Sequence, residues 1–269
     1  MNIPRHFLLL SIFTFLCLSQ TSRGNKTGIL AGPLGSVVSI AHRGAVVPEY
    51  PENTLMAFRK AMQAGSEVVE IDLRSSKDGE IVILHDSTLD RTTNGTGPVS
   101  DYTLTELKRL DAGMGERIPT YSEVLQLVSS TNAQLLLDLK VTSLPELTKI
   151  VRLTEKHGHV LNVIAAVRSL EELKDIQSLN PNLRTLAFIP EREDIETYSK
   201  AGVDIIRLWP DWIREDPNLV KKVHSLGNTV WTTSMKAKNE ELKELIGYGV
   251  NGLFTDFPEM VSRMRAELE

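Results

Sequence analysis

The sequence has little cysteine: Cys17 is the one cysteine in 269 residues, and it lies in an apolar run near the N-terminus. An internal disulfide framework is therefore excluded, and stability has to come from a hydrophobic core. Aromatic residues contribute only 6% of the chain. No later segment is long and uniformly apolar enough for a transmembrane helix, which needs roughly 20 residues. We therefore expect no stable membrane span in the mature protein.

The N-terminus has the pattern of an export signal. Arg5 and His6 precede an apolar run over residues 7–18, and small and polar residues follow over 19–24. This order predicts a signal peptide over residues 1–22, cleaved after Ser19 or Ser22, and a secreted protein, periplasmic or extracellular. A membrane-tethered form is the less favoured alternative. Residues 23–36 are expected to be a flexible lead-in.

The charge balance and the length limit the class of protein. The formal net charge is −5, so the chain lacks the excess of basic residues expected of a nucleic-acid-binding protein. We predict no nucleic-acid partner. The rest of the chain, residues 37–269, is close to the roughly 250 residues of a single (β/α)8 barrel domain.

Short β-branched runs alternate with longer amphipathic runs along the chain, as in an α/β protein. Only about eight residues, with the turn signal 77–79, separate the second and third strands, so these two form a hairpin. Removing that extra strand leaves eight βα units, which predicts a closed (β/α)8 TIM barrel. A doubly wound open sheet is disfavoured, because no Gly-rich phosphate loop follows the first strand. The expected strands are 37–41, 67–73, 81–84, 134–139, 160–167, 183–189, 203–208, 229–233 and 252–255.

A long segment without strands follows the hairpin. We expect an inserted lobe over about residues 87–120, with a helix over 103–110, and then a helix over 119–130 that returns to the barrel. Such a lobe would cover one end of the barrel.

Polar residues gather where the predicted strands end, and in a (β/α)8 barrel the active site lies at those C-terminal ends. Glu70 and Asp72 alternate along one strand, so both point to the barrel interior. Asp138 and Lys140 repeat this arrangement on the next barrel strand. Three carboxylates facing one interior favour a hard divalent cation, Ca²⁺ or Mg²⁺. Ion pairing with neighbouring basic residues is the structural alternative.

Two histidines also stand at strand ends. His42 and His85 can act as a general base and a general acid, because imidazole titrates near neutral pH. Arg43 offers a planar donor fork suited to phosphate oxygens. The remaining histidines of the C-terminal half, His157, His159 and His224, are interpreted as structural or surface residues.

Several of these motifs, in this order, resemble the glycerophosphodiester phosphodiesterase family. The matching pieces are His42-Arg-Gly, Pro51-Glu-Asn-Thr54, Glu70-x-Asp72, His85-Asp86, Thr92-Thr-Asn-Gly-x-Gly97, Ile118-Pro119, Asp138-Leu-Lys140, Val230-Trp-Thr232 and Thr255-Asp256. The resemblance implies a barrel with an inserted lobe and metal-dependent hydrolysis of glycerophosphodiesters, small-molecule substrates, to glycerol 3-phosphate and an alcohol. It implies catalytic roles for His42 and His85, metal ligation by Glu70, Asp72 and Asp138, and substrate contacts from Arg43, Lys140 and Trp231.

Two departures from the family pattern bear on the site. Asp138 stands where the family usually has the longer Glu, so this ligand acts through water or the metal lies nearer to its strand. Thr233 and Ser234 follow Trp231-Thr232 where the family often has Asn. Both departures concern the metal and the substrate contacts, and neither involves the histidines.

Three alternative functions remain open at this point. The first is lysophospholipase D-type activity with peripheral contact to a lysolipid, for which Phe188, Trp209 and Trp212 would line an acyl groove; ordinary packing of these rings is favoured. The second is a phospholipase-like barrel of the phospholipase D or phosphoinositide type. The third is a catalytically silent barrel that binds phosphorylated ligands.

Overall fold

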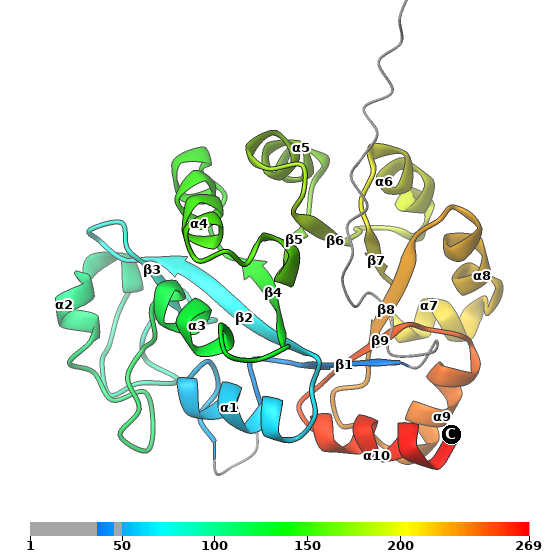
Figure 1. Cartoon of the computed structure of the whole chain (residues 1–269), viewed down its shortest axis with the longest axis horizontal. Helices are drawn as coiled ribbons and strands as arrows, with labels where there is room; N and C mark the ends of the chain where they lie inside the picture. The colour runs from blue at the N-terminus through cyan, green and yellow to red at the C-terminus, as the bar shows by residue number, and fades with distance from the viewer. Residues whose placement is uncertain (1–36, 46–49, 269) are drawn as a thin grey trace, which may run out of the picture.

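The computed structural model describes residues 37–45 and 50–268, and these residues form a closed barrel of eight parallel strands with helices outside it (Figure 1). The predicted signal peptide and lead-in lie outside the described residues. The predicted (β/α)8 barrel is confirmed. Its strands are β1 (Val38–Ala41), β2 (Val68–Ser75), β4 (Gln134–Leu139), β5 (Val163–Val167), β6 (Arg184–Phe188), β7 (Ile205–Arg207), β8 (Thr229–Thr233) and β9 (Gly252–Thr255).

The strand order closes the barrel and leaves one strand outside it. The order is β1-β9-β8-β7-β6-β5-β4-β2, and β2 pairs with β1 in parallel. The extra strand β3 (Ile81–Ile83) pairs antiparallel with β2, with Leu73 opposite Ile83, which confirms the hairpin. Strand β5 begins later than expected, because residues 160–162 form a 3-10 turn in which the Asn162 amide donates to the His159 carbonyl.

Helices follow the strands and pack around the barrel. Thr54 begins the first of them, accepting a hydrogen bond from the Ala57 amide, and Ser169 caps another in the same way. The helices are α1 (Leu55–Gln63), α2 (Leu104–Leu107), α3 (Tyr121–Val128), α4 (Leu144–Lys156), α5 (Leu170–Leu179), α6 (Ile195–Ala201), α7 (Pro210–Glu215), α8 (Asn218–Ser225), α9 (Asn239–Gly247) and α10 (Pro258–Leu268).

Alternation along each strand divides the core into two layers. In β2, Val69 and Ile71 pack outward with the helices, whereas Val68 belongs to the inner cluster with Leu136 and Trp231. Glu70 and Asp72 have the same parity as Val68 and therefore point inward. The apolar inner cluster fills the barrel interior, so the polar inward residues are left at the C-terminal ends of the strands.

The segment between β3 and α3 forms a lobe beside the barrel, seen with α2 at the left of Figure 1. It has its own small apolar cluster, which includes Leu89, Val99, Leu107 and Ile118, and which joins the barrel through Val82 of β3. A backbone bridge between Val82 and Thr120 ties the end of the lobe to the hairpin. The lobe is thus anchored next to the strand end that carries His85.

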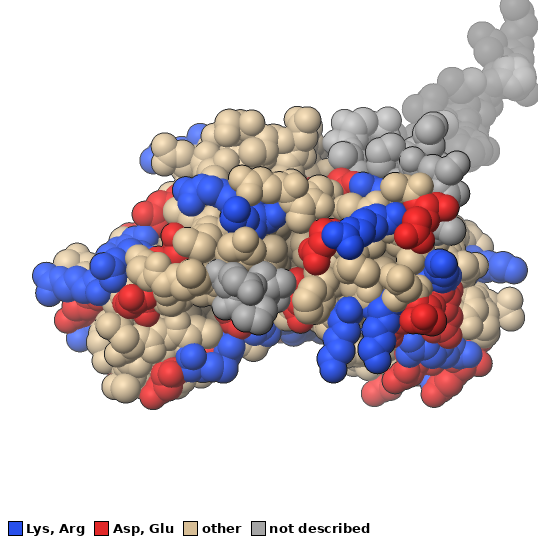
Figure 2. Space-filling view, turned by 90° about the horizontal axis from the view of Figure 1, so that it is seen from below, with Lys and Arg blue, Asp and Glu red and all other residues tan. Residues whose placement is uncertain are grey.

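The distribution of charge on the surface and the character of the helices also bear on possible partners. On the face shown in Figure 2, basic and acidic side chains are interspersed. Among the described helices, none combines the length and the apolar character that crossing a bilayer requires.

Candidate active site

A cavity of about 330 Å³ opens at the C-terminal ends of the barrel strands. It takes one side from β1, β2 and β4 and the other from the ends of β5 to β9, so residues distant in sequence face each other across it. Its lining consists of His42, Arg43, Glu70, His85, Asp138, Lys140, Arg168, Phe188, Arg207, Trp209, Thr233, Met235 and Phe254.

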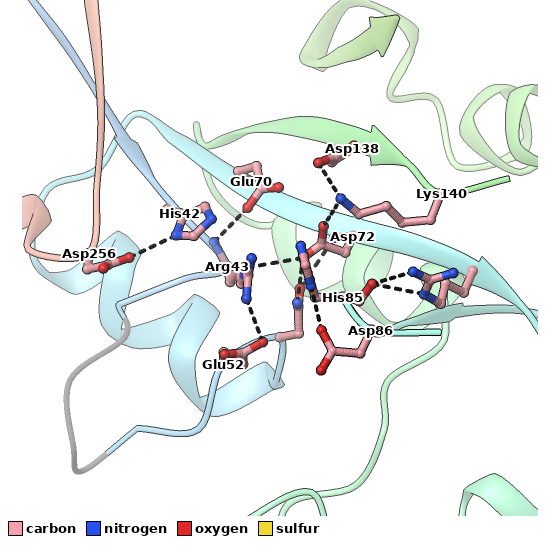
Figure 3. A network of polar contacts seen from close by, with 12 residues as sticks. His42, Arg43, Glu52, Glu70, Asp72, His85, Asp86, Asp138, Lys140 and Asp256 are labelled. Atoms are coloured by element: carbon pink, nitrogen blue, oxygen red, sulfur yellow. Dashed lines mark hydrogen bonds and ion pairs between the residues drawn. The ribbon is translucent and has the colours of Figure 1, made fainter. Parts of the chain in front are cut away.

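Three carboxylates cluster at one side of the cavity. Glu70, Asp72 and Asp138 are buried, and each offers an oxygen atom within 4.8 Å of the others (Figure 3). The parallel register of β2 and β4 explains this, because Asp72 pairs directly with Asp138 across the two strands. The predicted metal ligands are therefore brought together by strand pairing.

The electrostatics of this cluster fit a bound cation. Burial, together with the charges of Asp72 and Asp138, raises the pKa of Glu70 well above its usual range. The buried Oδ1 atom of Asp72 accepts no hydrogen bond, although the Lys140 ammonium lies 3.1 Å away. Three carboxylate oxygen donors are the kind of ligand set that Ca²⁺ or Mg²⁺ prefers. The residues present could hold a divalent metal ion.

Asp138, the position that departs from the family pattern, is neutralised on both oxygens. Its Oδ1 accepts from Arg168 at 2.6 Å and its Oδ2 accepts from Lys140 at 2.7 Å. Burial raises the pKa of Asp138, but the positive charges of Arg168 and Lys140 outweigh burial and the pKa is lowered. This carboxylate therefore stays ionised, and a metal ion bound to it would share its oxygens with Arg168 and Lys140.

Each of the two histidines is held by a carboxylate through the same ring atom. His42 Nδ1 lies 2.8 Å from Asp256 Oδ1, and His85 Nδ1 lies 2.7 Å from Asp86 Oδ1 (Figure 3). Such a contact fixes the ring orientation and places the proton on Nδ1, which leaves Nε2 as the reactive nitrogen. Both rings line the same cavity, so two oriented imidazoles face one bound molecule.

An ionic network connects the two histidine sites through the lobe. Arg91 donates to Asp86, the partner of His85, and to Glu52, which also accepts from Arg43. Hydrogen bonds from Arg91 and then His85 lower the pKa of Asp86. Burial raises the pKa of Glu52, but the two arginines outweigh it and lower that pKa. Both carboxylates therefore remain anionic and hold their basic partners in place.

The turn after β1 directs Arg43 toward the site. Arg43 has a left-handed φ of 55°, and its backbone amide donates to Glu70 Oε2 at 2.7 Å. Gly44 follows with a φ of 93°, and a Cβ there would lie 2.8 Å from the Ala57 Cβ. Only glycine satisfies both conditions. The Arg43 guanidinium then contacts Glu52 and lies 3.6 Å from Asp72.

The structure brings the predicted site residues together with one exception. His42, Arg43, Glu70, His85, Asp138 and Lys140 line the cavity, and Asp72 lies buried beside them. Trp231 does not reach it. Its ring is fully buried in the barrel interior, against Phe254 and directly over Gly252, because it points inward one step deeper along β8 than Thr233, which lines the cavity. The prediction that Trp231 contacts substrate is corrected by this placement; Trp209 lines the cavity instead.

Four residues outside the predicted set, Asn53, Arg168, Arg207 and Asp256, also lie at the site in the fold. Asn53 and Asp256 stood within motifs already noted, and Asn53 Nδ2 donates to Asp72 Oδ2 at 2.7 Å. Arg168 directly follows β5 and Arg207 ends β7. Their location at strand ends was the available signal, because that face of a barrel carries the site.

The aromatic residues considered for an acyl groove and the remaining histidines differ in their position relative to the cavity. Phe188 and Trp209 line the cavity, whereas Trp212 packs against the outer core. His157, His159 and His224 are not among the residues that line it; His224 Nε2 contacts Asn251 Oδ1 at 2.8 Å.

Known proteins share this sequence pattern. The model of the Glycerophosphoryl diester phosphodiesterase family matches residues 42–260. A glycerophosphodiester phosphodiesterase of Caldanaerobacter subterraneus subsp. tengcongensis is 34% identical over 233 residues, which are 82% of this chain and 94% of that protein. One from Bacillus subtilis is 28% identical and covers 96% of this chain and 95% of its own length.

Solved structures share the fold as well. The glycerophosphodiester phosphodiesterase of Agrobacterium tumefaciens superimposes with a TM-score of 0.74 at 27% identity, covering 84% of this chain and 99% of its own. A phosphodiesterase of Oleispira antarctica, solved in complex with the product sn-glycerol-3-phosphate, has a TM-score of 0.77 at 27% identity, with coverages of 84% and 96%. With the barrel and its clustered strand-end residues, these matches show that the chain belongs to the glycerophosphoryl diester phosphodiesterase family.

Proposed function

We propose that this protein hydrolyses glycerophosphodiesters to sn-glycerol 3-phosphate and an alcohol, with a divalent metal ion held by Glu70, Asp72 and Asp138. The observation that carries this proposal is the shared cavity, which joins two carboxylate-held imidazoles with the acidic cluster. The family membership and the product bound to the Oleispira antarctica relative support the same substrate class.

Each group in the cavity suits one part of this reaction. Lys140 and Arg43 bind the nonbridging phosphate oxygens and stabilise the charge that builds up on them. A bound Ca²⁺ or Mg²⁺ would polarise the phosphate and lower the pKa of a nearby hydroxyl. The Nε2 atoms of His42 and His85 are left to exchange protons with the substrate, because Asp256 and Asp86 occupy their Nδ1 atoms.

The reaction we propose has two steps. In the first, the glycerol hydroxyl next to the ester attacks phosphorus while His42 accepts its proton and His85 protonates the departing alcohol. In the second, water opens the cyclic phosphate; His85 accepts a proton from water and His42 returns its proton to the glycerol oxygen. Each proton transfer contributes on the order of 10² to 10⁴ in rate. A substrate without the adjacent hydroxyl tests the first step, and equal rates on both substrates would refute internal attack.

The activity is tested by the release of sn-glycerol 3-phosphate from glycerophosphocholine, glycerophosphoethanolamine and glycerophosphoserine. The protein is assayed with Ca²⁺, with Mg²⁺ and with a chelator, beside His42→Ala and His85→Ala. We expect release that depends on the metal and falls by at least about 10² in each variant. Absence of release with every metal would refute the proposal. Turnover of lysophospholipids alone would then indicate the lysophospholipase alternative, and binding without turnover would indicate a silent barrel.

We also propose that the protein is exported, on the basis of the basic, apolar and small-residue order of residues 1–24. Expression of the full chain in a secreting host, with mass spectrometry of the exported protein, tests this. A new N-terminus after Ser19 or Ser22 is the expected result. Full-length protein that keeps Met1 and stays inside the cell would contradict it.

A further inference from the structure

The wall of the cavity opposite the acidic cluster carries one arginine, Arg207, that the proposed chemistry does not use. Arg207 ends β7 and lines the cavity. Arg168, which follows β5, also lines the cavity but is paired with Asp138. In the barrel order β7 lies across from β1 and β2, which position His42 and Glu70. A molecule that reacts at the histidines can therefore reach this wall with its other end.

Arg207 is a buried cation without a counter-ion among the described residues. Arg207 is only 5% exposed, and its Nε atom has no hydrogen-bond partner among the described residues. Its Nη2 atom makes one long contact, 3.4 Å, to Thr233 Oγ1. No described carboxylate forms an ion pair with it. Burying an unpaired charge is costly, so an arginine retained in this setting is suited to an anion that enters the cavity.

The aromatic rings of this wall are already covered by guanidinium groups. The Arg207 guanidinium lies 3.2 Å from the centroid of the Trp209 ring and 5.7 Å from that of Phe188. Arg168 lies 4.9 Å from the Phe188 centroid. An ammonium group would normally bind such ring faces, but here it would meet positive charge. An acyl chain would equally have to displace the guanidinium groups, so these covered ring faces suit neither choline nor a fatty chain.

We propose that this wall binds a carboxylate or phosphate carried by the departing alcohol, an inference that rests on the proposed function. The attacking glycerol hydroxyl has to lie beside the acidic cluster, and the leaving oxygen lies roughly in line on the far side of phosphorus. The departing alcohol therefore extends toward β6 to β8. There the planar fork of Arg207 offers paired donors that match an oxyanion.

Glycerophosphoserine and glycerophosphoethanolamine form a matched pair, because their departing alcohols differ only by one carboxylate. With saturating metal ion, the wild-type protein should hydrolyse the serine compound with a kcat/KM about ten- to hundredfold higher. Arg207→Met should reduce this ratio to near one. Arg207→Lys, which keeps the charge but loses the fork, should keep part of it.

Arg184 provides the control, since it is also a buried arginine, with its guanidinium bonded to Gln134 and the Leu161 carbonyl at the opposite end of β6. Arg184→Met should leave the ratio unchanged, and a ratio does not depend on the amount of folded enzyme. Equal hydrolysis of both substrates by wild type, or a ratio that Arg207→Met leaves intact, would overturn the anionic-group inference alone. No hydrolysis of either substrate would overturn the proposed function and this inference with it.

Discussion

His42 and Asp256 are 214 positions apart in the chain, yet His42 Nδ1 lies 2.8 Å from Asp256 Oδ1. The contact exists because the barrel closes: β1 pairs in parallel with β9, with Ala41 opposite Thr255. His42 directly follows Ala41, and Asp256 directly follows Thr255. The orientation of this imidazole therefore depends on barrel closure.

Asp256→Asn should lower kcat for glycerophosphodiester hydrolysis by about 10² to 10⁴ with a much smaller change in KM. The Asn amide can donate to Nδ1 and so favour the wrong tautomer of His42. Steady-state kinetics measure this effect. Asp211→Asn is the control, because Asp211 is exposed and pairs with Arg214 on the same helix. Equal kcat values for wild type and Asp256→Asn would show that the contact does not serve the reaction.

The metal-free protein should lose stability as the pH rises, because the pKa of Glu70 is raised by burial and by the charges of Asp72 and Asp138. The folded protein holds this proton where the unfolded chain has released it. The stabilisation is thus fully present below the unfolded pKa and is lost as the pH rises through the folded pKa. Thermal unfolding in chelator, from about pH 5 to about pH 8, measures this.

Glu70→Gln is the matched variant for that measurement. It removes the titrating proton while its amide oxygen can still accept from the Arg43 amide. The variant should melt at a higher temperature than wild type in chelator at neutral pH, and Ca²⁺ or Mg²⁺ should no longer raise its Tm. If the pH dependence of the variant matched that of wild type, the acidic cluster would not be its cause.

Removing the Asn53 side chain should weaken metal binding by about ten- to hundredfold, because it orients the carboxylate of Asp72. Asn53 Nδ2 donates to Asp72 Oδ2, and the Asp72 amide donates back to Asn53 Oδ1. Asn53 has a φ of 57°, so Asn53→Gly tests the side chain alone, whereas Asn53→Ala adds backbone strain of about 1 kcal/mol. Calorimetric titration with Ca²⁺ and Mg²⁺ measures affinity. Wild-type affinity in both variants would exclude this positioning role.

Gly252→Ala should destabilise the fold by about 1 to 3 kcal/mol through overpacking. A Cβ at Gly252 would lie 2.6 Å from Trp231 Cδ1, and that ring is fixed in the barrel interior. Gly247→Ala, in α9, meets no atom within 4 Å and should be neutral or stabilising by up to about 1 kcal/mol. Urea unfolding compares the two. Similar free energies of unfolding for both variants would mean that the barrel interior can relax.

Local patterns were sufficient to predict the barrel and most of the acidic cluster. The β-branched runs, the short 77–79 turn and the number of βα units identified the eight-stranded barrel and its additional hairpin. Alternation along β2 predicted that Glu70 and Asp72 face inward, since the pleat has a period of two residues. These features depend on residues close together in the chain, which is why the sequence alone reveals them.

The contacts that the site residues make with one another could not be predicted in this way, because they join residues from different strands of the barrel. Trp231 shows the limit of local patterns. Alternation along β8 indicates that its ring points inward, but it does not indicate how deep in the barrel the ring lies. That depth decides whether a ring packs in the core or lines the cavity. Two arginines likewise contact residues from other strands: Arg168 contacts Asp138, and Arg207 lies over the Phe188 ring.

The sequence by itself determined the strands, their inward faces and the residue types available for chemistry, because propensity and periodicity are local. Only the tertiary structure decided that Asp256 holds His42, that Arg168 neutralises Asp138 and that Arg207 lies without a counter-ion among the described residues. Those relationships arise from strand register and barrel closure, which join residues that no local pattern connects.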